Sequence, residues 1–182
     1  MRSLLITLSL ASALAPVRGT TLERLPLGEM TQKSTAIMRA KVVGSSSVLR
    51  GADVYTVYQI EVVERWKSGG TSSPMQVAVP GGVAGGLRQM VAGAPRLHMG
   101  EEYVMFLWTG RSGLTQLMGL SQGLFNVHNN VHKNGAGDAT AMRAAAGELM
   151  LDSSGHAVKD EAVSMKLSDL KAQVQRALSG GK

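Results

Sequence analysis

The feature that most constrains the fold is a run of extended chain whose two faces are both apolar. The run lies within residues 100–127, with Tyr103, Met105 and Leu107 on one face and Val104, Phe106 and Trp108 on the other. Successive side chains of a strand point to opposite faces, so such a strand has to be covered on both sides. We therefore expect it to be the central strand of a packed sheet.

Turn signals divide the rest of this stretch into two further strands. Residues 111–113 predict a hairpin turn, residues 114–118 a returning strand, and Gly119 and Gly123 a second reversal before a strand at residues 124–127. Glycine supplies 22 of the 182 residues and aromatic residues only 4%. This balance favours short strands and tight turns, so the expected class is mainly β, an antiparallel barrel.

Four more segments are predicted to be strands of the same barrel: residues 35–43, 54–67, 75–79 and 87–92. The second is longer than a usual strand, which indicates that it coils around a closed barrel. Its core face is expected to carry Val54, Tyr58, Ile60, Val62 and Trp66. Residues 44–51 contain three consecutive serines between glycines and predict a polar loop.

Two helices are expected to cover the barrel. Pro26 can open a short helix within residues 20–33. Ser168 can cap a C-terminal helix that ends at Gly180. The apolar stripe of that helix comprises Leu170, Val174, Ala177 and Leu178. Its spacing predicts a helix packed on the barrel.

The chain between the barrel and the last helix has weaker patterns. Residues 128–146 show no periodicity, and they predict a long surface excursion. Residues 148–151 and 156–158 flank the turn sequence Asp-Ser-Ser-Gly at residues 152–155, which predicts a short hairpin. Residues 20–182 are therefore expected to form a single domain, a β-barrel with a C-terminal hairpin and helix.

The N-terminus has the three-part pattern of a secretory signal peptide. Arg2 precedes an apolar run at residues 4–15, and small residues follow. Cleavage after Gly19 is favoured over cleavage after Ala15, which would leave Pro16 first. Residues 1–19 are thus expected to be removed on export to the periplasm or the outside of the cell. The alternative is a helix buried in the mature fold.

The absence of cysteine rules out disulfides, zinc–thiolate sites and thiol nucleophiles. The formal net charge of +6 is spread along the chain, which indicates a mild bias toward anionic surfaces. No basic run is interleaved with aromatic residues, so nucleic-acid binding is not expected. We expect no cofactor and no stable membrane insertion after signal cleavage, and the pattern leaves the oligomeric state open.

Residues 80–86 form the densest glycine cluster of the chain. Glycines allow backbone N–H groups to approach a phosphate. The cluster has no Gly-Lys-Ser/Thr ending, no dinucleotide spacing and no following helix. We therefore favour a bulged connection between two strands over a phosphate site.

Residues 119–123 match the Gly-x-Ser-x-Gly pattern of a serine nucleophile, with Ser121 at its centre. Acidic and histidine partners follow along the chain: Asp138, Asp152, His128, His132 and His156. A nucleophile elbow needs a helix after the serine, whereas residues 124–127 predict a strand. A serine hydrolase is accordingly the least favoured of the functions considered.

His128 and His132 have a spacing that would place both on one side of a helical turn, as in metal sites. The asparagines and glycines around them disfavour a helix, and no third ligand has a suggestive position. We interpret both as loop histidines, with no metal site predicted.

Four segments together resemble a known architecture: STAIMRAKVV at residues 34–43, YTVYQIEVVERWK at 55–67, VAVPGG at 77–82 and GEEYVMFLW at 100–108. Their order resembles that of uncharacterised secreted bacterial proteins with a barrel of the oligonucleotide/oligosaccharide-binding (OB) type. These are similar to the N-terminal domain of tissue inhibitors of metalloproteinases. The resemblance implies a barrel that binds a partner such as a secreted protease, in the manner of an inhibitor. Those inhibitors use an N-terminal cysteine at the catalytic zinc, and this chain has none, so no inhibitory residue is carried over.

The first hypothesis is therefore an exported, non-enzymatic binding module for a secreted protein or a glycan. A protease-inhibitor-like protein and a serine hydrolase using Ser121 are the alternatives. The expected contact loops are residues 44–51, 80–86 and 111–113. The candidate binding residues within or beside them are Arg50, Gly81, Gly82, Gly85, Gly86, Arg88 and Arg111. The alternative for the three arginines is that they only solvate the surface.

Overall fold

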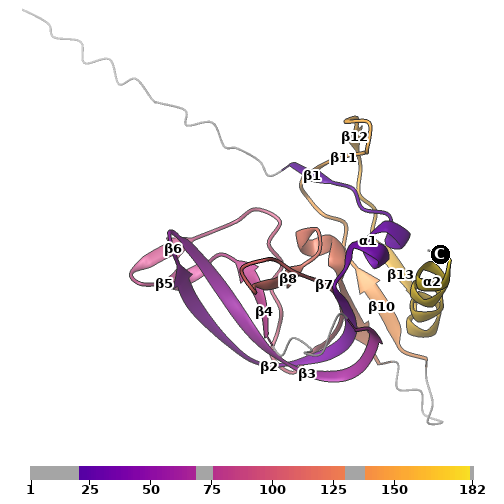
Figure 1. Cartoon of the computed structure of the whole chain (residues 1–182), viewed down its shortest axis with the longest axis horizontal. Helices are drawn as coiled ribbons and strands as arrows, with labels where there is room; N and C mark the ends of the chain where they lie inside the picture. Colours follow the sequence, from indigo (N-terminus) through magenta and orange to yellow (C-terminus); the bar gives the residue numbers. More distant parts are fainter. Residues whose placement is uncertain (1–20, 69–75, 130–137, 181–182) are drawn as a thin grey trace, which may run out of the picture.

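The computed structural model describes residues 21–68, 76–129 and 138–180. The chain is mainly β with two α-helices, as predicted (Figure 1). Residues 1–19, the predicted signal peptide, lie outside the described part. Within the described residues, neither helix has the length and apolar character needed to cross a bilayer.

Five strands form a closed ring: β2 (Ala36–Arg50), β3 (Asp53–Lys67), β4 (Gln76–Pro80), β7 (Glu102–Thr109) and β8 (Thr115–Leu117). The order around the ring is β7-β2-β3-β4-β8 and back to β7. All neighbours are antiparallel except β4 and β8, which join in parallel through Ala78 and Gln116. A five-stranded barrel of this kind, completed between β4 and β8 by a single residue pair, is of the OB type. The predicted fold class is confirmed.

β7 is the central strand, as expected. One of its edges pairs with β2, and the other is shared by β9 (Leu124–His128) and β8. A 3-10 helix, η1 (Leu120–Gly123), joins these two short strands. Both faces of β7 are covered from Tyr103 to Leu107, and Phe106 is completely buried.

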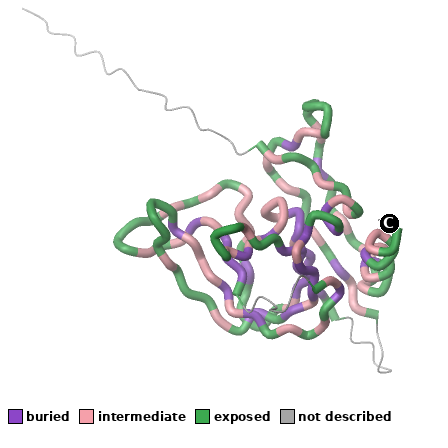
Figure 2. The backbone as a smooth tube through the Cα atoms, in the orientation of Figure 1, coloured by how far each residue is buried: buried purple, intermediate pink, exposed green. Residues whose placement is uncertain are grey.

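The two faces of β7 belong to two separate cores, which Figure 2 shows as buried chain at the centre of the molecule. The inner core fills the ring and contains Met38, Val42, Tyr58, Ile60, Val77, Tyr103, Met105 and Leu107. The outer core lies between the sheet and the helices and contains Met30, Ile37, Trp66, Val104, Phe106, Phe125, Leu170 and Val174. The predicted core residue Val62 is only partly buried.

The helices α1 (Leu27–Lys33) and α2 (Leu167–Ser179) cover the outer core. Pro26 occupies the N-cap position of α1, as expected. Lys67 Nζ donates hydrogen bonds to the carbonyls of Thr31 and Gln32, which lie at the C-terminal end of α1. Ser168 does not cap α2: the N-cap position is Lys166 and Ser168 lies inside the helix, so that prediction was wrong. The predicted stripe of α2 does face the core, with Leu170 and Val174 fully buried.

The predicted loop at residues 44–51 is instead part of β2. This strand pairs with β3 as far as the Arg50–Asp53 pair, so that only Gly51 and Ala52 form the turn. The serines resemble a loop in composition, but β3 supplies a partner for each of them. The two strands thus form one long hairpin.

The prediction that Trp66 shares the core face of Tyr58 and Ile60 was wrong, because the pairing between β2 and β3 is irregular. Met38 pairs with Arg65 and the preceding Ile37 with Lys67, so Trp66 is an extra residue in β3. Val63 is a second extra residue, between Glu64 and Val62. A bulge changes the face to which the following side chains point. Trp66 therefore packs in the outer core, whereas Tyr58 and Ile60 fill the ring.

Residues 128–146 are not wholly a surface excursion. β10 (Thr140–Arg143) pairs with β9 and with β13 (Val163–Lys166), which extends the sheet beyond the ring. Ala141 is completely buried in the outer core. A strand that buries alanine has little hydrophobic contrast, and this is why the sequence did not show it. Residues 130–137 lie outside the described part.

The predicted hairpin after this segment is confirmed. It consists of β11 (Leu149–Leu151) and β12 (Ala157–Val158), and Asp152 Oδ1 accepts hydrogen bonds from the N–H groups of Ser154 and His156. β1 (Thr21–Glu23) adds a parallel strand to β11.

A candidate binding groove

A groove of about 750 Å³ crosses one side of the ring. Its lining residues come from β2 and β3, from β4, and from the β7–β8 turn with the start of β8: Ser46, Val48, Leu49, Arg50, Val57, Gln76, Ala78, Gly113, Leu114 and Thr115. The β2–β3 hairpin and the β7–β8 turn border the strands between them. In OB-type barrels the loops in these two places flank the ligand.

The strand register explains why these side chains lie together. Ser46 pairs with Val57, Val57 with Ala78, Ala78 with Gln116, and Gln116 with Trp108. Paired residues share a face of the sheet. Their neighbours in sequence, such as Tyr58 and Val77, point into the ring. The five paired residues therefore form a row across the outer face of β2, β3, β4, β8 and β7.

Trp108 ends this row and is 46% exposed. A Cβ on Gly110 would lie 2.9 Å from the indole, so glycine at this position lets the ring lie against the backbone of the turn. An indole held in this way offers an amphipathic surface on which a ligand can stack. The sequence placed Trp108 in the central strand, but did not predict its exposure.

One of the three predicted arginines, Arg50, lines the groove. Arg111 does not line it, but lies in the β7–β8 turn two positions before the lining residue Gly113. Both are exposed, and neither forms an ion pair among the ion pairs seen in the described chain. Arg88 is exposed on a different element, β6 (Leu87–Gln89), and does not line the groove.

The glycine cluster forms a hairpin of its own rather than a bulged connection. β5 (Gly82–Ala84) pairs with β6 around a turn at Gly85 and Gly86. The predicted strand at residues 87–92 is therefore shorter and lies outside the ring. The hairpin is anchored to β3: Gly81 N donates to Val54 O at 2.7 Å, and Val54 N donates to Gln89 Oε1 at 2.6 Å.

The glycines have a structural explanation in this hairpin. Gly82 has φ of 136°, and a Cβ there would lie 2.8 Å from Thr56 Oγ1 and 2.9 Å from Ser47 Oγ. Gly81 is buried with its N–H already paired, so it offers no donor to an anion. Gly85 and Gly86 are exposed at the turn with positive φ.

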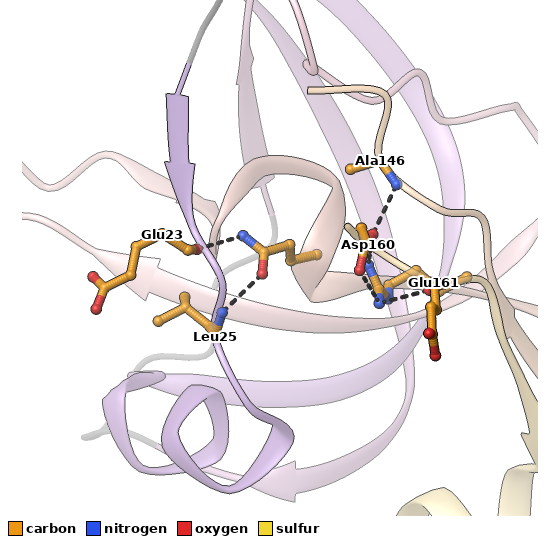
Figure 3. A network of polar contacts seen from close by, with 7 residues as sticks. Glu23, Leu25, Ala146, Asp160 and Glu161 are labelled. Atoms are coloured by element: carbon orange, nitrogen blue, oxygen red, sulfur yellow. Dashed lines mark hydrogen bonds and ion pairs between the residues drawn. The ribbon is translucent and has the colours of Figure 1, made fainter. Parts of the chain in front are cut away.

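Ser121 does not have the surroundings of a nucleophile in the structure. It lies in η1 between two strands, and its Oγ is buried without a hydrogen-bond partner among the described residues. The Gly-x-Ser-x-Gly sequence at residues 119–123 has a structural role instead, which depends on the neighbouring Gln122. Its side chain accepts a hydrogen bond from Leu25 N and donates one to Glu23 O, both at 2.9 Å, and so ties the N-terminal segment to the ring (Figure 3). A Cβ on Gly123 would lie 2.6 Å from Met118 O, which explains that glycine.

The described residues contain no group of three or more histidine, cysteine, aspartate or glutamate side chains placed to hold a metal ion. His128 is exposed at the end of β9, and His156 is exposed in the β11–β12 turn. His132 lies outside the described part of the chain.

An ion pair between Arg143 and Asp160 ties β10 to the segment before β13. The two Arg143–Asp160 contacts measure 2.7 and 3.0 Å, and Ala146 N also donates to Asp160 (Figure 3). Burial opposes ionisation of Asp160, but the hydrogen bonds from Arg143 and Ala146 outweigh it and hold the pKa of this carboxyl below its usual value. This buried pair joins two parts of the fold, and neither of its residues lines the groove described above.

A second polar network closes one end of the ring. The Tyr103 hydroxyl accepts from His98 N and donates to Glu101 Oε2 at 2.7 Å, and Asn126 donates to the same carboxylate oxygen. Burial raises the pKa of Tyr103 to about 12, and its hydrogen bond lowers the pKa of Glu101. These contacts hold residues 98–101 over the inner core, which accounts for both pKa changes.

The fold and groove define the chain as an OB-type barrel with an extended groove across its side. Comparison with models of protein families gave no match, and comparison with curated proteins gave none either.

Proposed function

We propose that this chain is an exported, non-enzymatic binding module, and that its ligand lies in the groove between the β2–β3 hairpin and the β7–β8 turn. The observation that carries the proposal is the groove together with the row of outer-face side chains from Ser46 to Trp108. Ser46, Val57 and Ala78 of this row line the groove, and Gln116 and Trp108 continue the row beyond it. An extended groove on a rigid barrel suits a chain-like ligand.

The chemistry of the groove favours a glycan over a protein segment. Ser46 and Gln76 offer a hydroxyl and an amide group, and Gln116 and Trp108 continue the row. The Thr115 hydroxyl is already paired with that of Thr109. Sugars are bound by such polar groups and by stacking on aromatic rings. Arg50 and Arg111 can bind carboxylate or sulfate groups of an acidic sugar. β2 pairs with β7 only as far as Lys41, so among the described residues its half beside the groove is paired on the β3 side alone. A peptide strand added to that edge is the alternative that the test below addresses.

To test this proposal, wild type, Val57→Arg and Val63→Arg are each immobilised and exposed to the exported fraction of the producing cell. The material that each protein retains is then compared. Val57→Arg places a long charged side chain in the groove. Val63→Arg is the matched control, because Val63 lies on the same strand, is 49% exposed and does not line the groove. We expect wild type and Val63→Arg to retain material that Val57→Arg does not retain.

The nature of the retained material decides the ligand class. Loss of retention after periodate oxidation, but not after protease treatment of the fraction, supports a glycan. Loss after protease treatment alone would replace the glycan with a protein partner and would bring forward the inhibitor hypothesis. Equal retention by Val57→Arg and wild type would contradict the proposed site.

The hydrolase alternative has a direct test of its own. A fluorophosphonate reagent labels activated serines, and label that is lost in Ser121→Ala would contradict the non-enzymatic proposal.

A further inference from the structure

Two hairpins lie side by side at one end of the molecule. The first is the end of β2–β3, with its turn at Gly51 and Ala52, and the second is β5–β6, with its turn at Gly85 and Gly86. β5 packs against both β2 and β3, and a Cβ on Gly85 would lie 3.2 Å from Leu49 Cδ2. Figure 1 shows these hairpins at the end of the molecule away from α2.

Large apolar side chains are exposed on this pair of hairpins. Leu49 is 43% exposed, Val83 56%, Leu87 51% and Met90 82%, and we name these four residues the tip patch. The four residues come from adjoining hairpins, with Val83 and Leu87 on opposite faces of the β5–β6 ladder. Exposed apolar groups gathered at one end of a molecule mark a candidate site of interaction. The tip patch is aliphatic, whereas the centres of protein interfaces are enriched in Trp, Tyr and Arg.

Cationic side chains accompany the tip patch. Arg50 follows Leu49 in sequence, and Arg88 pairs across β5–β6 with Val83. Asp53 is the only acidic residue at the two hairpin ends in the described chain, and it accepts a long hydrogen bond of 3.5 Å from Gln89. The hairpins therefore present apolar groups with a net positive charge, in a chain whose formal net charge is +6.

We propose that the tip patch inserts into the surface of an anionic phospholipid bilayer. Aliphatic side chains at hairpin tips enter the boundary between headgroups and acyl chains, while Arg50 and Arg88 remain at the level of the phosphates. Pairing between β5 and β6 satisfies the backbone groups that face each other within the hairpin, which reduces the number of unpaired polar groups carried into the interface. Leu49 and Arg50 also line the groove, so a ligand there would be held next to the membrane surface.

The absence of cysteine makes a site-specific test simple. Met90→Cys places a single thiol in the tip patch, and Met142→Cys places one on β10, at a residue that is 44% exposed. Both full chains are labelled with the polarity-sensitive fluorophore NBD. They are mixed with vesicles of phosphatidylcholine alone or with 30% phosphatidylglycerol. Any tethering by the apolar residues 4–15 is common to both labelled proteins.

The expected result is a blue shift and a severalfold increase in emission for the Met90→Cys label with the anionic vesicles. The Met142→Cys label should remain unchanged. No response at the Met90→Cys label, or the same response at both positions, would overturn the proposal. A response that requires a protein extract instead of vesicles would overturn it in favour of a protein partner.

A charge variant completes the test. Replacing Arg50 and Arg88 together by glutamine in the labelled Met90→Cys protein removes two cations near the anionic surface. The lipid concentration for half of the emission change should then rise about 30-fold. An unchanged lipid requirement would contradict the role of the two arginines and, with it, the choice of an anionic bilayer.

Discussion

Phe106 and Trp108 lie two residues apart on β7 and point to the same outer face, yet Phe106 is fully buried and Trp108 is 46% exposed. Phe106 packs in the outer core beneath the helices and contacts Phe125 with ring centroids 5.8 Å apart. Trp108 lies beside the β7–β8 turn, at the end of the groove row. The outer face of one strand therefore serves both packing and the proposed binding site.

This difference gives a paired prediction. Phe106→Ala should lower the free energy of unfolding by about 3–5 kcal/mol, because it opens a cavity in a closed core. Trp108→Ala should lower it by about 1 kcal/mol or less, because its side chain is half exposed. Urea unfolding of both variants provides the measurement. If both variants lost a similar free energy of unfolding, Phe106 and Trp108 would not differ in packing as described.

Asp160 is predicted to stabilise the fold in a pH-dependent manner. Its side chain is 2% exposed, and Asp160→Asn would leave Arg143, 12% exposed, without its counter-charge. We expect a loss of about 3 kcal/mol at pH 7. The exposed Asp169→Asn at the start of α2 is the control and should cost a few tenths of a kcal/mol.

The sign of the pH dependence follows from the lowered pKa of Asp160. The stabilisation is complete above the unfolded-state value of 3.8 and is lost as the pH falls through the lower folded-state pKa. Wild type and Asp160→Asn should therefore converge in stability below about pH 3.8. A difference that persists undiminished at lower pH would show that the carboxylate charge is not its source.

At the residue scale, the sequence predicted burial better than exposure. Alternation along β7 indicated two apolar faces, and both are covered for most of the strand. The exposure of Trp108 depends on where α1, α2 and the β7–β8 turn end, and these come from other parts of the chain. The role of Gln122, which ties down residues 23–25, likewise needs a contact across 97 positions of the sequence.

At the scale of elements, some segments form strands although their composition is not typical of strands, because a neighbouring strand pairs with them. The serines of residues 45–47 resemble a loop, but each has a paired residue on β3. β10 has little hydrophobic contrast, yet it pairs with β9 and β13 on its two sides. The glycine cluster forms a hairpin because its glycines allow it to lie close to β2 and β3.

The close packing of this hairpin predicts unequal effects of two alanine substitutions. Gly82→Ala combines a backbone conformation that L-residues avoid with close contacts to Ser47 and Thr56, and should cost about 2–4 kcal/mol. Gly86→Ala has a φ of 76° but open space around its Cβ, so it should cost about 1 kcal/mol. Thermal unfolding measures both, and a harmless Gly82→Ala would show that the hairpin does not pack against β2 and β3 as described.

At the scale of the whole molecule, a ring of five strands presents a groove on one side and buries its other outer surface under two helices. The order of strands could be predicted as a barrel from periodicity and from the resemblance. The groove could be predicted only in part, since Arg50 and the turn at Arg111–Gly113 were identified but Val57, Ala78 and Gln76 were not. Those three residues meet through pairing between distant strands, which local sequence does not encode.

Export is a further prediction at this scale. Mature protein should begin at Thr20 and be found outside the cytoplasm, because residues 1–19 have the pattern of a signal peptide. N-terminal sequencing of protein recovered from each cell fraction provides the test. An intact chain starting at Met1 in the cytoplasm would contradict it.

Hydrogen exchange of the protein with and without its captured ligand is the most direct measurement of where binding occurs. The account predicts that the ligand slows exchange at the ends of β2 and β3 near Arg50 and Val57, and in the β7–β8 turn around Gly113 and Leu114. Amides of β10, β13 and α2, on the helical side, should be unaffected. Protection confined to β10, β13 or α2, with none at the groove, would contradict the central claim that this groove is the binding site.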